Sequence, residues 1–181
     1  MECEVSILES FVKSLHKILK AITNLFGTIA GFLILCIAFM ITYEVIVRAA
    51  FNAPTEWVTE ISTYFLSIGG FLGMGVAYAG KKHIRVDIFL TKMSHKTQTY
   101  LSLITSLLGA FYAFLFAMKG LDMALLSLEL DNRAPTTLSS PLWIPQMSMP
   151  LGLGLLAFLL LETFFVDIVR IQKNDYEWEV K

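Results

Sequence analysis

The amino-acid sequence predicts an all-α integral membrane protein, a single membrane domain with four transmembrane helices. Of its 181 residues, 56% are hydrophobic and only 16% are charged, whereas soluble domains carry about 25% charged residues. The mean hydropathy of +0.66 is too high for a small globule, which must cover its surface with polar groups, and it also excludes a disordered chain. Uncharged segments recur at the length of about 20 residues that a helix needs to cross the hydrocarbon core.

The first predicted span covers residues 21–47. Its uncharged part, residues 21–43, is longer than the 7–15 apolar residues of a signal peptide, so we expect a retained helix. In the preceding residues 4–20, apolar positions lie on one side and charged positions largely on the other. This pattern is typical of a helix that lies in the membrane interface.

The other predicted spans cover residues 57–80, 97–120 and 145–167. A helix continuing from Thr97 to Leu130 would be about 51 Å long, so its end must leave the hydrocarbon. The fourth span is expected to begin near Pro145, because proline is tolerated in a first turn, with Pro150 near that turn or at a slight kink. Residues 84–96 mix apolar and charged side chains and predict a second interfacial helix.

The distribution of Lys and Arg predicts the orientation of these spans. Basic residues concentrate in three segments that four crossings place on one side: Lys13, Lys17 and Lys20; Lys81, Lys82, Arg85, Lys92 and Lys96; Arg170, Lys173 and Lys181. The opposite side carries only Arg48 and Arg133, with Lys119 near the end of the third span. Because cytoplasmic loops are enriched in these residues, both termini are predicted to be cytoplasmic.

The charge balance does not favour a nucleic-acid partner, and the candidate catalytic and metal-binding residues do not favour an enzyme. The net charge is −1, which leaves no strongly basic surface. Cys3 and Cys36 form no disulfide framework or metal-binding spacing, and the three histidines, His16, His83 and His95, lie outside the predicted spans, where they are unsuited to bind haem between helices. No glycine-rich phosphate loop or catalytic set is present, so we expect no catalytic residue, metal or cofactor.

Charged residues gather at the predicted turn between the first two spans. Glu44 and Arg48 share a helix face, as do Glu56 and Glu60, and the turn between them brings Arg48 within reach of Glu56 or Glu60. We interpret this as an ion-pair clasp that holds the hairpin, the alternative being a substrate or ion gate. Trp57 is predicted to anchor the helix at the interface.

Two further motifs have structural and functional interpretations. His83, Arg85 and Asp87 follow the second span, and the spacing of His83 and Asp87 favours a surface pair that ends the helix over a pH-sensitive pair. Small residues also recur at helical spacing in the first two spans, where backbones can approach closely. This packing face serves either the chain itself or a partner: Gly27, Gly31, Gly69, Gly73 and Ala77.

Several motifs, in order, resemble the small membrane subunit of tripartite ATP-independent periplasmic (TRAP) transporters. The family signature matches around the outer hairpin at Glu44, Arg48, Asn52, Pro54, Trp57 and Glu60, and continues through Gly69–Gly80 and His83–Asp87. A second patch resembles the family's start of the fourth helix: Trp143, Pro145, Pro150 and Gly152. Thr59 departs from the family, which often has a first glutamate there, and this leaves Glu60 as the matching carboxylate.

The resemblance implies a scaffold subunit in the bacterial inner membrane. It implies a large multi-helix membrane subunit that moves as an elevator in sodium-driven uptake, and a periplasmic binding protein that delivers an organic acid, a carboxylate. The small subunit would pack beside the large one among membrane lipids and bind no substrate itself. The rival hypothesis is an autonomous homo-oligomeric transporter or channel in which Glu44 or Glu60 carries a proton; a membrane-bound redox enzyme is a third, less favoured class.

Overall fold

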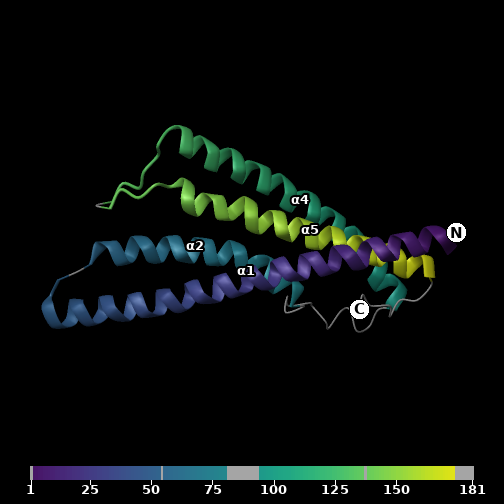
Figure 1. The fold of residues 1–181 in the computed structure, drawn as a ribbon, viewed down its shortest axis with the longest axis horizontal. Coiled ribbons are helices and arrows are strands. Elements are labelled where there is room, and N and C mark those ends of the chain that lie inside the picture. Colours follow the sequence, from purple (N-terminus) through teal and green to yellow (C-terminus); the bar gives the residue numbers. More distant parts are fainter. Residues whose placement is uncertain (1, 54, 81–93, 137, 174–181) are drawn as a thin grey trace.

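The structure, a computed structural model, describes residues 2–53, 55–80, 94–136 and 138–173. Its helices are α1 (Glu2–Phe51), α2 (Glu56–Ala79), α4 (His95–Glu129) and α5 (Trp143–Lys173). All four are long and apolar enough to cross a membrane, so the predicted fold class is confirmed. The α1–α2 and α4–α5 connections lie at one end of the bundle and the N-terminus at the other (Figure 1). Following the predicted orientation, we call these the outer and the inner end.

The four helices form two pairs that meet through α5. The most extensive contacts join α4 to α5 and α1 to α2, while α5 also packs against α2 and α1 (Figure 1). Large apolar side chains point outward over much of the surface, among them Phe32, Phe39 and Phe111, which are 63%, 69% and 60% exposed. Such exposure would be costly in water and is expected where lipid surrounds the helices.

Two helices are much longer than a bilayer is thick. The 50 residues of α1 extend over about 75 Å, against about 40–45 Å for a bilayer with its headgroups. Residues 4–20 continue into the first span as one helix, so a separate interfacial helix is not confirmed. The helix expected from Thr97 to Leu130 is confirmed as α4. Most of the second predicted interfacial helix, residues 84–93, lies outside the described residues, and α4 already begins at His95.

The outer ends of α1 and α4 are closed by residues in the left-handed conformation. Asn52 (φ 52°) follows α1 and donates its N–H to the Arg48 carbonyl at 3.1 Å. Asp131 (φ 46°) lies two residues beyond the end of α4. The next residue, Asn132, donates its N–H to the Ser127 carbonyl at 2.9 Å. Asn and Asp tolerate this conformation better than most residues, and these bonds satisfy carbonyl groups that a helix end would leave unpaired.

The α4–α5 pair packs through small residues. The buried residues of α4 recur at alternating intervals of three and four: Ser106, Ala110, Ala113, Ala117, Gly120, Ala124 and Ser127. A side chain at Gly120 would meet Met149 and Pro150 of α5 at 3.0–3.3 Å. Close backbone approach therefore holds this pair, as is usual where lipid removes the hydrophobic drive.

Candidate functional site

A buried carboxylate closes the turn between α1 and α2. Glu44, on the last turns of α1, is only 7% exposed. Its Oε1 accepts hydrogen bonds from Arg48 at 2.5 and 3.1 Å, and its Oε2 accepts the backbone N–H of Thr55, just before α2, at 3.0 Å. One side chain thus joins the end of α1 to the start of α2.

A second buried carboxylate holds the loop between α4 and α5. Glu60 of α2 is 8% exposed; its Oε2 accepts the Thr136 hydroxyl at 2.5 Å and its Oε1 the Ser140 N–H at 3.2 Å. Tyr64, one turn further along α2, donates its hydroxyl to the Ser140 carbonyl at 3.1 Å. The Ala134 N–H bonds across the loop to the same carbonyl at 2.9 Å, so the loop is folded and fixed to α2.

These contacts correct the predicted ion-pair clasp. Arg48 pairs with Glu44 of its own helix rather than with Glu56 or Glu60. The link across the hairpin is the hydrogen bond from Thr55 to Glu44, and Glu60 is committed to the second outer loop. The charge of Arg48 is therefore paired within α1. Each of the two connections is instead closed by a hydrogen bond from a backbone N–H to a buried carboxylate.

Trp57, the predicted interfacial anchor, lies near the start of α2 and is 41% exposed. Its ring faces Tyr43 of α1, with the ring centroids 6.2 Å apart. Tyr and Trp are enriched where one end of the ring meets water and the other lipid. The structure places this pair at the level of the α1–α2 turn, and its position at the membrane interface stays a prediction.

Polar contacts also join the helices towards the inner end. His16 Nδ1 of α1 lies 2.5 Å from Glu162 Oε1 of α5, and Glu162 is 8% exposed. One residue further, the Thr163 hydroxyl lies 2.9 Å from the hydroxyl of Tyr78 on α2. These two contacts tie α5 to both helices of the other pair.

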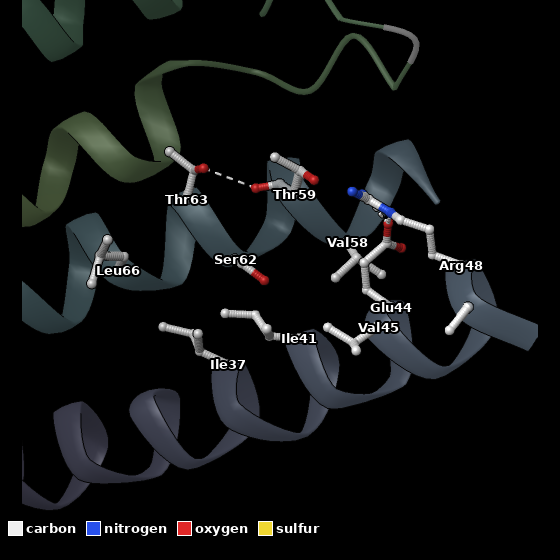
Figure 2. A pocket seen from close by; sticks show the side chains of 11 residues that line it. Ile37, Ile41, Glu44, Val45, Arg48, Val58, Thr59, Ser62, Thr63 and Leu66 are labelled. Atoms are coloured by element: carbon white, nitrogen blue, oxygen red, sulfur yellow. Dashed lines mark hydrogen bonds and ion pairs between the residues drawn. The ribbon is translucent and has the colours of Figure 1, made fainter. Parts of the chain in front are cut away.

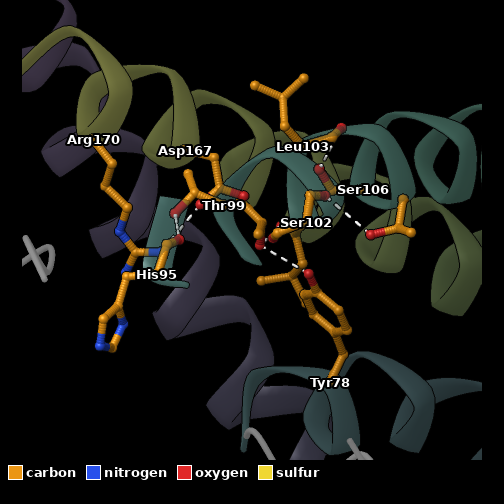
Figure 3. Close-up of polar contacts among 11 residues, drawn as sticks. Tyr78, His95, Thr99, Ser102, Leu103, Ser106, Asp167 and Arg170 are labelled. Carbon is orange, nitrogen blue, oxygen red and sulfur yellow. Dashed lines mark hydrogen bonds and ion pairs between the residues drawn. The ribbon is translucent and has the colours of Figure 1, made fainter. Parts of the chain in front are cut away.

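Asp167 extends the inner polar region and is fully buried. Its Oδ1 accepts a hydrogen bond from Arg170 at 3.0 Å. Figure 3 shows these two α5 residues facing the first turns of α4, where the buried Thr99 donates its hydroxyl to the carbonyl of His95 at 3.0 Å, with Tyr78 of α2 nearby. Across the described ranges, no three His, Cys, Asp or Glu side chains are grouped as metal ligands would be.

Glu162, Asp167 and Tyr78 were not among the residues predicted from the sequence. The first two lie inside the predicted fourth span, near its inner end, where a carboxylate without a partner is costly. That position was an available signal for a buried contact. Their partners were not predictable, because His16 and Glu162 are 146 residues apart in the chain.

Some residues of the predicted packing face lie in a contact between helices, and others do not. A Cβ at Gly27 would meet Val76 at 3.3 Å, and one at Gly69 would meet the Ala30 carbonyl oxygen at 3.7 Å, so both lie in the α1–α2 contact. Gly31 and Gly73 have open space where a Cβ would be, and Ala77 is exposed.

The closest helix contacts involve other glycines. A Cβ at Gly75 of α2 would lie 2.9 Å from Leu155, and one at Gly152 of α5 would overlap the backbone of Phe71 in α2. Gly152, expected as part of the start of the fourth helix, is therefore the point at which the α2 and α5 backbones meet.

The remaining predicted residues are placed as follows. Trp143 begins α5, Pro145 is buried in its first turn, and Pro150 lies inside the helix against α4. Asn52 ends α1. Four predicted residues lie outside the described residues: Pro54, His83, Arg85 and Asp87.

Residues 37–170 match the family model described as "Tripartite ATP-independent periplasmic transporters, DctQ component". The chain belongs to this family. As a DctQ component it is a multi-pass membrane component of TRAP transporters, which are not a class of enzyme. The match includes both outer loops and the buried carboxylates that hold them.

Two relatives of this DctQ protein are longer permeases. It is 25% identical over 103 residues to the sialic acid TRAP transporter permease protein SiaT of Haemophilus influenzae, a match covering 57% of this chain and 17% of the relative. It is 25% identical over 134 residues to the isethionate TRAP transporter permease protein DctMQ of Oleidesulfovibrio alaskensis, covering 71% and 21%. The match thus spans about a fifth of each relative.

Proposed function

We propose that this chain is the small scaffold subunit of a TRAP transporter in the bacterial inner membrane, with both termini in the cytoplasm. It supports a large multi-helix subunit that moves as an elevator in sodium-driven uptake. The proposal is carried by the comparison with the relatives, in which the matching segment is only about a fifth of a permease. The remaining four fifths would correspond to the moving, substrate-binding part.

The polar contacts support an immobile role. The carboxylates of Glu44 and Glu60 accept loop N–H groups, and Glu162 and Asp167 contact the side chains of His16 and Arg170. A transport site needs polar groups that exchange partners during the cycle. Glu44, Glu60 and Glu162 instead connect their helices to a neighbouring helix or loop, which suits a frame against which another subunit moves.

The folded outer loops suit contact with a periplasmic binding protein. Glu60 and Tyr64 hold the α4–α5 loop against α2, and Glu44 holds the α1–α2 turn. Because hydrogen bonds already hold the described residues of both loops in place, docking would cost little conformational entropy. We propose that both loops face the periplasm and meet the binding protein transiently.

The transported substrate is proposed as an organic acid. One relative is named for sialic acid and the other for isethionate; the first is a carboxylate and the second a sulfonate. The shared chemistry is an organic anion, which is broader than the carboxylate expected from the sequence. Its identity would be set by the large subunit and the binding protein.

Co-purification and reconstitution test this function. The chain is expressed with and without the large membrane subunit of its transporter, and both preparations are reconstituted into liposomes with the binding protein and a sodium gradient. We expect a stable complex and uptake only when the large subunit is present. Uptake by this polypeptide alone would refute the scaffold role. Loss of transport in Glu44→Gln with normal assembly would favour the rival proton-carrying transporter.

A further inference from the structure

One face of α2 is largely exposed in the part of the chain that the structure describes. Gly69 and Gly75 point into the contacts with α1 and α5. A second set of α2 residues, spaced by alternating four and three positions, lies along a different side of the helix. Apart from the partly buried Gly73, they are exposed, and the two glycines among them have open space around a built Cβ: Thr59, Thr63, Leu66, Gly70, Gly73 and Ala77. We call this set the open face of α2.

The outer half of the open face borders a groove. Thr59, Thr63 and Leu66 line a groove of about 610 Å³ between α1 and α2, with Ile37 and Ile41 on the α1 side (Figure 2). The groove is mainly apolar, and at its outer end the Glu44–Arg48 pair closes it. It is open to the side rather than enclosed by this chain.

Ser62 places an unpaired polar atom in this groove. The residue is only 9% exposed, and its buried Oγ has no hydrogen-bond partner among the residues that the structure describes. Figure 2 shows the Ser62 hydroxyl directed between α1 and α2, towards Ile41. An unpaired hydroxyl in an apolar setting is costly, about 1–3 kcal/mol in proteins. A partner that enters the groove could provide the missing acceptor.

The outward face of α4 has the opposite character. Its exposed residues are bulky and apolar, including Phe111, Tyr112, Phe114 and Phe116, which are 52–63% exposed. Lipid accommodates such side chains readily, whereas helix–helix interfaces in membranes are enriched in Gly, Ala, Ser and Thr. The open face of α2 therefore has the composition of a protein contact, and the α4 face that of a lipid contact.

We infer that the open face of α2 and the adjoining groove are the docking surface for a transmembrane helix of the large TRAP subunit. The inference rests on the proposed function and names the surface that the scaffold uses. The occupant is a helix because small and hydroxyl residues let backbones approach closely, and the relatives carry additional permease chain beyond the matched segment. Ser62, whose Oγ is buried without an acceptor among the described residues, lines the groove at this contact.

Site-specific photo-crosslinking tests this surface in the intact complex. A benzophenone amino acid replaces Leu66 on the open face, which is 64% exposed, or Phe114 on α4, which is 56% exposed. The chain is co-expressed with the large subunit, irradiated in membranes and purified. We expect a covalent adduct with the large subunit from position 66 and lipid adducts alone from position 114.

The other outcomes are also informative. Lipid adducts alone, or a dimer of this chain, from position 66 in a recovered complex would overturn the docking surface and leave the proposed function standing. Equal adducts with the large subunit from both positions would overturn the distinction between the faces. Failure to recover any complex, even with the unmodified chain, would overturn the proposed function itself.

A pair of glycine substitutions provides an independent test. Gly73 on the open face and Gly154 on α5 both have open space around a built Cβ, so leucine at either position should leave the isolated chain folded. We expect Gly73→Leu to reduce recovery of the large subunit several-fold and Gly154→Leu to leave it unchanged. Size-exclusion profiles of each variant alone check the fold. Unchanged recovery with folded Gly73→Leu would contradict the inference.

Discussion

The contact of Gly152 with α2 makes the sharpest prediction about stability. A Cβ at this position would overlap the carbonyl of Phe71 and lie 3.1 Å from the Phe71 Cβ. The obstacle is mainly backbone, so a rotamer change cannot relieve it. Gly152→Ala therefore requires α2 and α5 to move apart, which also loosens the nearby contact between Gly75 and Leu155.

The magnitude follows from two opposing effects. Alanine in place of glycine favours a helix by about 1 kcal/mol, while overpacking of a close contact costs about 1–3 kcal/mol and occasionally more. Because the overlap at Gly152 is with backbone, we expect the upper part of that range and a net loss of about 2 kcal/mol. Gly154 lies two residues along the same helix, and a Cβ built there meets no other part of the described chain within 4 Å. Gly154→Ala should therefore be neutral or stabilising by up to about 1 kcal/mol.

Thermal unfolding of the purified chain in detergent measures the difference. A loss of 2 kcal/mol corresponds to a fall in Tm of about 4–8 °C for a chain of this length. Retention of the folded peak in size-exclusion chromatography after heating gives the midpoint for each variant. If Gly152→Ala were as stable as Gly154→Ala, the α2 and α5 backbones would not meet at this glycine.

Three further predictions concern the polar contacts. Glu44→Ala should lower stability by about 1–3 kcal/mol because it leaves a loop N–H without an acceptor. Arg48→Ala should lower it by less than about 1 kcal/mol because the arginine side chain is 61% exposed, and equal thermal midpoints of the two variants would contradict this order. Glu60→Ala should speed hydrogen exchange at the Ser140 amide at least tenfold, measured by mass spectrometry of the α4–α5 loop, while unchanged protection would show that the loop does not depend on this carboxylate. Tyr78→Phe should lower the free energy of unfolding by about 0.6 kcal/mol, the mean for hydrogen bonds between membrane helices. A double-mutant cycle with its threonine partner on α5 should give that value as the coupling energy, and additive effects of the two substitutions would exclude the bond.

The sequence by itself determined the class of protein, a helical membrane protein with four helices long and apolar enough to cross a bilayer. Within lipid a helix satisfies its own backbone hydrogen bonds, so an apolar stretch of sufficient length is enough to predict a span. The start of α5 was readable for a similar reason, because Pro145 acts through local backbone geometry in the first turn of that helix. The ordered family motifs were also local, and they led to the family that the comparison confirms.

Contacts between distant residues were decided only by the tertiary structure. Glu60 was expected near Arg48, yet it binds Thr136, which is 76 residues away in the chain. Which glycines pack inside the chain was equally undetermined, and Gly152 and Gly75 proved closer to their neighbours than Gly31 or Gly73.

The reason is that lipid and protein interior are both apolar. In water, the polar side of a helix shows which face is buried, but in a bilayer each helix can rotate about its axis with little change in hydropathy. Rotation is then fixed by close backbone contacts and by a few buried polar groups, such as Glu162 with His16. Those partners come together only when the helices are assembled, which is why hydropathy predicts the spans and not their facing sides.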